Sequence, residues 1–280
     1  YAYLPGSPWP AVERASGEIE FDRLAMHLRR LQGQLWGYEL REVQGGIADL
    51  AAPQPVLVLQ GRGRGPAADV LRFARLAPLG QKAGAALEPV SITGSSELLL
   101  STQIALAGGA PTTLRGSLQL AGNDLRVHPD LPPLLGARGT LELSPQGLQV
   151  RALNARLLGG DTTLDGSIGS DGALRVSAQG TATAEGLRSL SQPAGLARVG
   201  GLLRGQAAWR GTLAVVDGRQ ELALQSNLVG MEIDLPAPLG KPVAGNPLPM
   251  RLQLSPLDDP AAPGGRARDS LQFELGELLK

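Results

Sequence analysis

The sequence is poorest in three things: cysteine, aromatic residues and an excess of charge of either sign. It has no cysteine, which excludes a disulfide framework, a zinc site built on thiolates and a cysteine nucleophile. Only 3% of the residues are aromatic, so a core has to be built from aliphatic side chains. The 26 basic residues balance the 26 acidic ones. This balance argues against a nucleic-acid-binding protein, because such proteins neutralise phosphates with basic side chains.

The chain does contain enough apolar material to bury a core. Hydrophobic residues make up 42% of it, and 38 Gly with 22 Pro form about a fifth of the 280 residues. The longest uncharged stretch, residues 98–114, is interrupted by Ser, Thr, Gln, Gly and Pro. It is no membrane-spanning helix, which needs about 20 mostly apolar residues. The chain begins at Tyr1 with neither Met nor a signal-peptide pattern, so we expect an excerpt or a processed chain.

Strict alternation of apolar with small or polar residues is the commonest pattern, and it is typical of half-buried strands. Turn signals separate the alternating segments. Asp171-Gly172 and Asp217-Gly218 suit tight hairpins, because glycine tolerates positive φ, and we interpret Gly122-Asn123-Asp124 as a turn as well. We therefore predict antiparallel strands at residues 114–120, 125–127, 140–143, 148–150, 164–168, 174–178, 221–225, 231–235, 251–254 and 271–275.

Between residues 114 and 178 a hairpin unit recurs loosely, each time with a glycine inside a strand: Gly116, Gly139 and Gly166. Such a glycine usually marks a bulge, a bend or a close approach of two backbones. The drifting period indicates a degenerate hairpin repeat rather than a solenoid of fixed length.

Helical patterns are rare. One short helix is predicted at residues 66–78, opening at a proline and ending before another, and a single turn at residues 186–190. A flexible loop is expected at residues 256–268, which are rich in Asp, Pro and Gly. The fold class is therefore mostly β, with one or two short helices, and residues 1–280 are expected to form a single segment of a longer protein.

Four groups of residues could carry chemistry, and each has a plainer explanation. A strand at residues 56–60, glycines at residues 61–65 and the expected helix follow the order of a dinucleotide-binding turn. However, Pro66 stands where the third glycine is required and no further βαβ unit follows, so we expect an ordinary loop. The two histidines, His27 and His128, lie about a hundred residues apart, and no Gly-x-Ser-x-Gly motif accompanies them.

Acidic and basic candidates are equally weak. Asp130 and the Asp258-Asp259 pair are not embedded in a calcium-binding loop. The arginines at 62, 64, 72 and 75 could contact anionic groups, but a solvated loop-and-helix surface is the simpler interpretation. We predict no catalytic residue, no metal ligand and no cofactor.

What remains is the aliphatic face that each alternating strand presents, with almost no amphipathic helix to cover it. A sheet can manage such faces as a sandwich, as a closed barrel or as a curved sheet whose aliphatic side lines a groove. A groove for acyl chains needs smooth aliphatic walls, and the stripe that includes Leu114, Leu118 and Leu141 would supply them. Periodicity alone does not decide among the three.

Residues 225–241, QSNLVGMEIDLPAPLGK, resemble a signature of the YhdP branch of the AsmA-like family. The matching positions are Ser226, Leu228, Gly230, Leu235, Pro236, Pro238 and Lys241. Residues 127–134, 139–143 and 157–160 agree with the same family, and the resemblance is most specific over residues 125–245. Asn227 stands where we expect Asp more often.

The resemblance implies a large envelope protein of a Gram-negative bacterium, anchored in the inner membrane by a helix outside these residues. It implies a periplasmic span of repeating β units curled into a hydrophobic groove that moves phospholipid between the inner and outer membranes. The partners expected are phospholipid acyl chains, the two membranes through other parts of the protein, and envelope proteins not identified; no nucleic acid is expected.

On this interpretation the groove is lined by aliphatic residues of the alternating strands. These candidates are Leu114, Leu118, Leu120, Leu125, Val127, Leu141, Leu143, Leu148, Val150, Leu164, Ile168, Leu174, Val176, Leu222, Leu224, Ile233 and Leu235. The alternative function is a scaffold for outer-membrane biogenesis whose sheet edges bind partner strands. An enzyme is a distant third possibility, which would require a pocket at His27 or His128.

Overall fold

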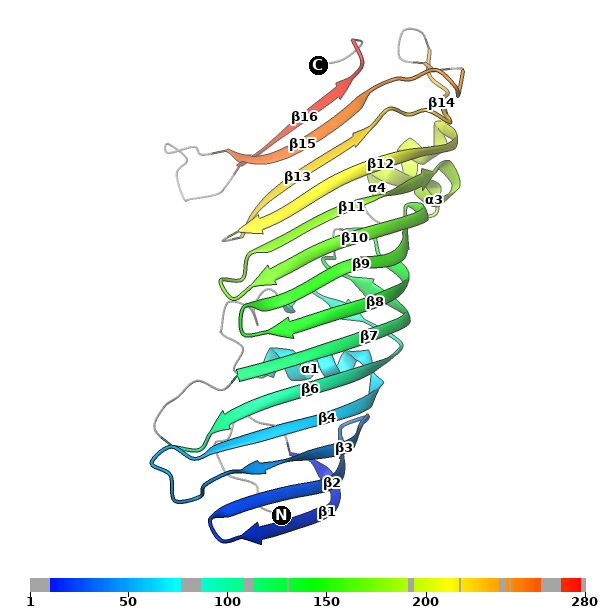
Figure 1. The fold of residues 1–280 in the computed structure, drawn as a ribbon. Helices are drawn as coiled ribbons and strands as arrows, with labels where there is room; N and C mark the ends of the chain where they lie inside the picture. The colour runs from blue at the N-terminus through cyan, green and yellow to red at the C-terminus, as the bar shows by residue number, and fades with distance from the viewer. Residues whose placement is uncertain are drawn as a thin grey trace.

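The described residues of the chain form one open antiparallel sheet of 16 strands (Figure 1). The computed structural model describes residues 11–76, 87–107, 113–129, 131–190, 194–216, 218–236, 240–241, 243–257 and 268–277. Strands account for 67% of the structure, and the sheet does not close on itself. The predicted class, a mostly β antiparallel sheet with few short helices, is therefore confirmed, and the sandwich and the closed barrel are excluded.

The strands are β1 (Glu13–Asp22), β2 (Ala25–Leu35), β3 (Tyr38–Ile47), β4 (Val56–Pro66), β5 (Ser91–Ile92), β6 (Ser95–Ala105), β7 (Thr113–Arg126), β8 (Leu134–Ser144), β9 (Gly147–Leu157), β10 (Gly159–Gly169), β11 (Leu174–Thr183), β12 (Leu203–Val216), β13 (Arg219–Ser226), β14 (Met231–Ile233), β15 (Met250–Leu257) and β16 (Arg268–Leu275). The helices among the described residues are α1 (Ala67–Leu76), α3 (Ala184–Arg188) and α4 (Ala194–Gly201).

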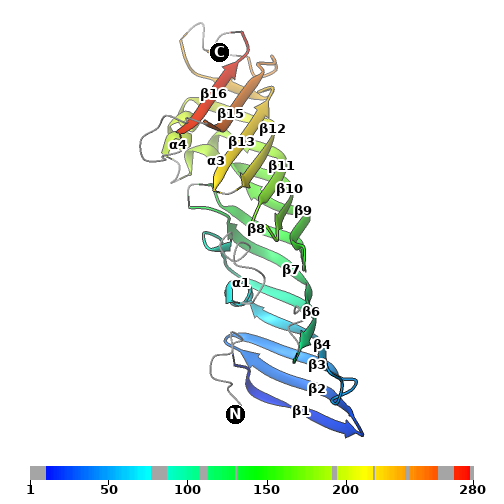
Figure 2. The same cartoon turned by 90° about the vertical axis from the view of Figure 1, so that its left-hand side faces the viewer.

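The topology is a meander in which each strand pairs with the strands that precede and follow it. Two short strands depart from this path, since β5 pairs with β7 and β14 pairs with β12. Figure 2 shows α1, α3 and α4 on the same side of the sheet. The described part of the molecule is therefore a single sheet with a few helices on one of its two faces.

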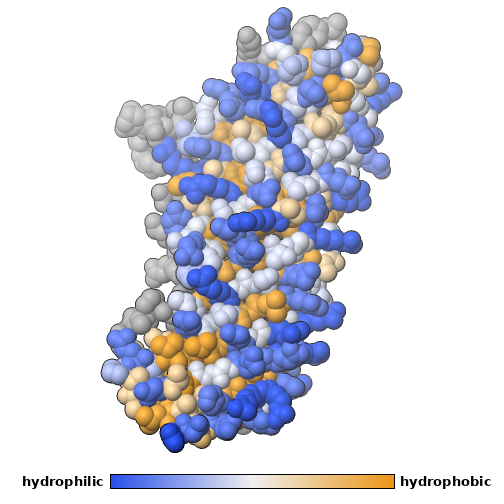
Figure 3. Space-filling model, in the orientation of Figure 1, coloured by the Kyte–Doolittle hydropathy of each residue, from blue (hydrophilic) through white to orange (hydrophobic). Residues whose placement is uncertain are grey.

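The register gives the sheet one aliphatic face and one polar face. Leu118 pairs with Leu98 on β6 and with Leu141 on β8, so the three side chains lie side by side. Residues at odd offsets from them point the other way. There, Arg62 pairs with Glu42 at 2.9 Å and Arg29 with Glu20 at 3.0 Å. Figure 3 views this second face, on which hydrophilic side chains predominate along most of the sheet.

The turn predicted at Gly122-Asn123-Asp124 is wrong, because β7 runs through these residues. The register shifts on both sides of Asn123, which makes the site a bulge within the strand. The Asn123 side chain is 1% exposed. Its Oδ1 accepts the Ala121 N–H at 3.0 Å, and its Nδ2 donates to the carbonyls of Thr93 at 2.7 Å and Ser95 at 2.9 Å. These hydrogen bonds pair backbone groups that the bulge leaves without partners in the sheet. The strand therefore continues through Asn123 and does not turn.

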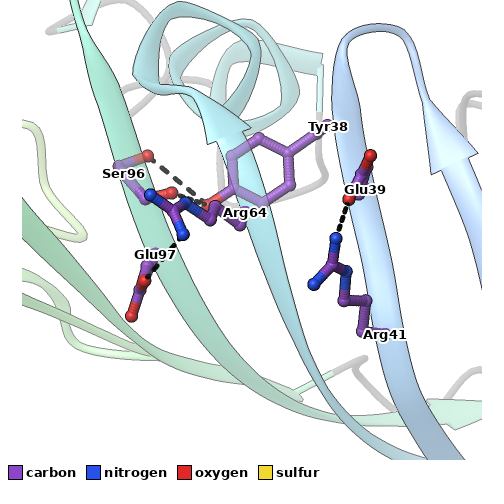
Figure 4. Close-up of polar contacts among 6 residues, drawn as sticks. All are labelled: Tyr38, Glu39, Arg41, Arg64, Ser96 and Glu97. Atoms are coloured by element: carbon purple, nitrogen blue, oxygen red, sulfur yellow. Dashed lines mark hydrogen bonds and ion pairs between the residues drawn. The ribbon is translucent and has the colours of Figure 1, made fainter.

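The glycine-rich stretch at residues 61–65 is also not a loop, since it belongs to β4. The ring of Tyr38 lies against it: a Cβ on Gly63 would stand 2.6 Å from Tyr38 Cε1. Only glycine permits this approach. The Tyr38 hydroxyl donates to the Ser96 carbonyl at 3.1 Å, while Arg64 and Glu97 pair at 3.9 Å (Figure 4). The dinucleotide-binding interpretation therefore fails on geometry as well as on spacing.

The helices differ in how visible they are in the sequence. Helix α1 lies within the predicted range 66–78, and α3 covers most of the expected turn at 186–190. Thr183 caps α3, its Oγ1 accepting the Gly186 N–H at 2.9 Å. Helix α4 was not predicted, because its glycines have low helix propensity.

The far C-terminal elements differ from the sequence pattern only in their lengths. The strand expected at residues 231–235 is the shorter β14, Met231–Ile233. Of the loop expected at 256–268, residues 256–257 belong to β15 and residue 268 to β16, and residues 258–267 lie outside the described residues.

Candidate apolar binding face

The aliphatic side of the sheet, here called the apolar face, is built of cross-strand rows that run from β6 to β16. One row consists of Leu98, Leu118, Leu141, Val150, Gly166, Val176, Leu213, Leu222, Leu254 and Leu271. A parallel row over the later strands consists of Leu164, Ala178, Gly211, Leu224, Leu252 and Phe273. Neither row contains an ionisable side chain.

Most of the predicted lining residues lie on this face, but they differ in burial. Leu120 and Leu164 are 3% and 7% exposed and belong to a buried core under α1 and β5. Half-buried candidates include Leu118, Leu143 and Leu222. The remaining candidates on the main path of the sheet are likewise buried or half-buried: Leu114, Leu125, Val127, Leu141, Leu148, Val150, Ile168, Leu174, Val176 and Leu224.

Two predicted lining residues lie elsewhere. Ile233 is on β14, off the main path of the sheet, and packs against a second core formed by α3, β12 and neighbouring elements. Leu235 follows β14 and is 37% exposed. Their alternation with polar residues has the period of a strand, but the strand pairs with the start of β12 rather than extending the rows.

Several residues of the apolar face were missed. Leu213 and Phe273 are examples, and Leu98 and Leu100 are others. The alternation in residues 203–216 could have revealed the first of these. Leu98 and Leu100 were hidden because Leu99 between them is also apolar, although it points to the polar face and is 57% exposed.

One part of the apolar face is partly covered. A cavity of about 320 Å³ lies between the sheet on one side and α1, residues 87–90 and β5 on the other. Its lining includes Leu71 and Ala74 of α1, Ile92 of β5, and Leu98 and Leu118 of the sheet. We call this cavity the α1 chamber.

The other part of the apolar face, over β11–β16, is more open. Leu213, Leu222 and Leu254 are half-buried there, and Leu271 on the last strand is 65% exposed. Helices α3 and α4 pack at one end of these strands, over a core that contains Leu187 and Leu203. We call the aliphatic surface of β11–β16 the open track.

The polar face is hollowed too, but its chemistry is different. One depression there, of about 1250 Å³, is lined by side chains of both charges, including Arg138, Arg210 and Asp161. A second depression of about 810 Å³ contains Arg151, Asp165 and Glu221 among its walls. Size therefore does not identify the apolar site, and an apolar ligand would leave these charged groups desolvated at a high cost.

The candidates for catalysis do not converge. His27 lies in β2 and His128 follows β7, with β3, β4 and β6 between these strands. Asp130, Asp258 and Asp259 lie outside the described residues. Across the described part of the chain, no three His, Asp or Glu side chains are grouped so that they could hold a metal ion.

The four arginines of the suspected basic cluster do not form a joint site. Arg62 and Arg64 project from β4 to the polar face and pair with Glu42 and Glu97. The Arg72 guanidinium lies over the Trp36 ring, 4.1 Å from its centroid. Arg75 donates to backbone carbonyls of residues 87–90. The expected loop-and-helix surface is wrong for the first two, because they stand on a strand.

The signature residues form a structural joint between β12, β13 and β14. Ser226 Oγ donates to the Ala208 carbonyl at 2.7 Å and accepts the Leu228 N–H at 3.0 Å. Lys241 Nζ donates to the carbonyls of Met231 at 2.6 Å, and of Val243 and Ala244 at 2.9 Å each. Gly230 turns the chain at φ +93°. Pro236 follows β14, and Pro238 lies outside the described residues.

Fold and face together define an open, single-sheet β protein that presents a continuous aliphatic surface. The family model described as YhdP protein matches residues 1–280, and the chain therefore belongs to the YhdP family. This family is non-enzymatic and bridge-like, and membership indicates a general role in lipid transport and the cell envelope. No curated protein and no solved structure gives a significant match. None of the described helices has the length and apolarity needed to cross a membrane.

Proposed function

We propose that this chain is a non-catalytic segment of a periplasmic bridge that carries phospholipid between the inner and outer membranes of a Gram-negative bacterium. The observation that carries the proposal is the continuity of the aliphatic rows from β6 to β16, without an ionisable side chain in them. Family membership supports the envelope role and the lipid class in general. Anchoring in the inner membrane would be supplied by parts of the protein outside this chain.

The hydrophobic effect is sufficient to hold an acyl chain on this face while the chain slides along it, and no chemical reaction is required. Each methylene group kept out of water is worth about 0.8 kcal/mol, so an acyl chain on the face gains several kcal/mol. Rows of similar aliphatic residues offer the chain nearly equal positions along the sheet. At about 4.8 Å between neighbouring strands, the meander of β1–β16 spans roughly 60 Å. A passive face of this kind needs neither cofactor nor catalytic residue.

The test uses two neighbouring residues of β13 that are both half-buried and point to opposite faces. Leu222→Asp places a carboxylate in the aliphatic row, whereas Ala223→Asp places it on the polar face. Phospholipid that co-purifies with each variant is measured by mass spectrometry. We expect wild type and Ala223→Asp to retain phospholipid and Leu222→Asp to lose most of it. Equal retention by the two variants, or wild-type protein free of phospholipid, would contradict the proposal.

The edges of the sheet favour the second candidate, a scaffold that binds partner strands. In the described residues β1 pairs only with β2, and β16 only with β15, so each has one edge available. Cross-linking from β1 separates the two functions. A partner protein captured along β1, together with no phospholipid on the apolar face, would favour the scaffold.

A further inference from the structure

Helix α1 is fixed across the apolar face at its first turns. The Ala67 N–H donates to the Gly94 carbonyl at 2.9 Å, and Ala67 is fully buried. Asp69 Oδ2 accepts the Gly37 N–H at 3.0 Å, and the Arg72 guanidinium covers the ring of Trp36. The β2–β3 turn and the connection between β5 and β6 therefore hold the start of the helix.

The end of the helix is held just as firmly. The Arg75 guanidinium donates to the carbonyls of Leu87 at 2.9 Å, Glu88 at 3.0 Å and Val90 at 2.5 Å. This joins α1 to residues 87–92, of which Leu87, Val90 and Ile92 face the sheet. The polar side chains of α1 are thus used on its outer side, and its apolar side chains are left to form a roof.

The space beneath this roof is the α1 chamber, of about 320 Å³. An apolar cavity of about 150 Å³ stays dry and binds benzene or xenon. The chamber is about twice that size, and Ser144 supplies the only polar side chain among its described lining residues. A peptide segment would leave its N–H and C=O groups without partners there, and a charged group would have no counter-ion. The lining suits one flexible hydrocarbon chain.

We propose that the α1 chamber is a discrete binding site for a single linear acyl chain, distinct from the open track over β11–β16. The inference rests on the proposed function and deepens it, because it adds a partly covered binding site to an otherwise open path. The acyl chain lies between α1 and β6–β8 with its polar head outside the roof. Transport past this point requires the chain to thread beneath α1 rather than slide over an exposed face.

The first test fills the chamber. Leu98 and Leu99 are neighbours on β6; Leu98 lines the chamber, and Leu99 points to the polar face. Binding of palmitic acid is measured by calorimetry with the purified chain, and circular dichroism verifies folding. We expect Leu98→Trp to weaken binding by about tenfold or more, because an overpacked cavity has no room for the ligand, and Leu99→Trp to leave it unchanged. Equal affinities of the two variants would overturn the site.

The second test leaves the sheet untouched and uses the absence of cysteine from the chain. Ala74→Cys places a thiol in the chamber wall, and Leu76→Cys places one on the exposed side of α1, where Leu76 is 50% exposed. Palmitic acid should slow alkylation of the first thiol only, and equal rates with and without palmitic acid would overturn the inference.

Repeating the alkylation with dioleoylphosphatidylglycerol in detergent identifies the source of the chain. Protection by both ligands assigns the site to the acyl chain of a phospholipid, and protection by palmitic acid alone assigns it to a free fatty acid. The proposed function is judged separately. If Leu222→Asp abolishes phospholipid retention while Ala74→Cys shows no protection, transport along the open track stands and the chamber site fails.

Discussion

At the scale of single residues, two buried side chains each hold distant strands together. Tyr38 is 2% exposed and spans from β3 across β4 to Ser96 on β6. Lys241 is 5% exposed and gathers three carbonyls around its ammonium group. Both side chains donate hydrogen bonds to carbonyls that water does not reach. Removal of either side chain therefore leaves buried carbonyls without that donor, which lowers the stability of the folded state.

Because of Tyr38, the free energy of unfolding should decrease at alkaline pH. Burial raises the pKa of its phenol above the ordinary value of 10.0; a hydrogen bond that the Ser96 hydroxyl can donate to the phenolate partly opposes this rise, and the nearby Glu97 carboxylate adds to it. The folded state therefore holds the proton more tightly than the unfolded state. The contribution of the protonated phenol to the free energy of unfolding is complete below about pH 10. It is lost as the pH rises through the raised pKa of the folded state.

Tyr38→Phe tests this directly. At neutral pH we expect a loss of about 1 kcal/mol, since one hydrogen bond disappears and the Ser96 carbonyl loses a donor. Urea unfolding of both proteins at about pH 8 and about pH 11 should show that the wild type loses more stability between the two than the variant does. A difference that is independent of pH would contradict the assignment.

Lys241→Met should loosen the joint of the signature residues. The variant leaves the carbonyls of Met231 and Val243 without their ammonium donor, and we expect a cost of about 3 kcal/mol. Hydrogen exchange of the Met231 and Ile233 amides should become faster. The control is Arg251→Met, which removes only an exposed pair with Glu274 and should cost at most about 1 kcal/mol. An equal loss of stability in the two variants would show that the buried hydrogen bonds of Lys241 contribute no more than an exposed ion pair.

At the scale of elements, α1 depends on its attachments more than on its own propensity. A helix of 10 residues is marginal in water, so tertiary contacts have to hold it in place. Its position over the sheet follows from bonds to the β2–β3 turn on one side and to residues 87–90 on the other. Loss of one attachment should open the roof locally without disturbing the sheet.

Arg75→Met removes the attachment at the end of α1. We expect faster hydrogen exchange in residues 67–76 and 87–92, with β8–β10 unchanged. Arg72→Met is a useful comparison, because it removes only the contact with the Trp36 ring, worth about 0.5–1 kcal/mol at an exposed site. Uniform protection of α1 in the Arg75 variant would contradict the role of this arginine.

At the scale of the whole molecule, the meander topology makes the free energy of unfolding approximately a sum of contributions from pairs of adjacent strands. Each strand of the main path pairs with the strands beside it, and among the described residues no second sheet joins the ends. Proteins of this kind resemble linear repeats, in which one region can unfold while another persists. The buried cores are also separate: one lies under α1 and β5, the other beside α3.

Unfolding should therefore not be two-state. Trp36 lies between β2 and β3, and Trp209 on β12, so single-tryptophan variants report on opposite halves of the sheet. The first carries Trp9→Phe and Trp209→Phe, and the second carries Trp9→Phe and Trp36→Phe. Fluorescence-detected urea titrations should give two distinct midpoints, whereas coincident transitions would indicate one cooperative unit.

The sequence by itself determined the character of the sheet. Alternation placed Leu118, Leu141 and Leu222 on one face, because the side-chain period of a strand is two. The glycines of β4 and the bulge at Asn123 were misread, since the same residues favour turns when no neighbouring group satisfies their backbone. In these places the ring of Tyr38 and the carbonyls of Thr93 and Ser95 decided the conformation.

Only the tertiary structure decided how the apolar face is divided. Local patterns cannot reveal that α1 folds back over β6–β8, because the bonds of Arg75 and Asp69 join it to residues outside its own segment. Nor does alternation distinguish a closed sheet from an open one, since each gives every strand one aliphatic side. The openness of the meander and the roof over one part of it depend on long-range pairing. The sequence has few aromatic residues and no net charge, and this composition predicted a smooth aliphatic surface. The strand register aligned the aliphatic side chains of neighbouring strands into continuous rows.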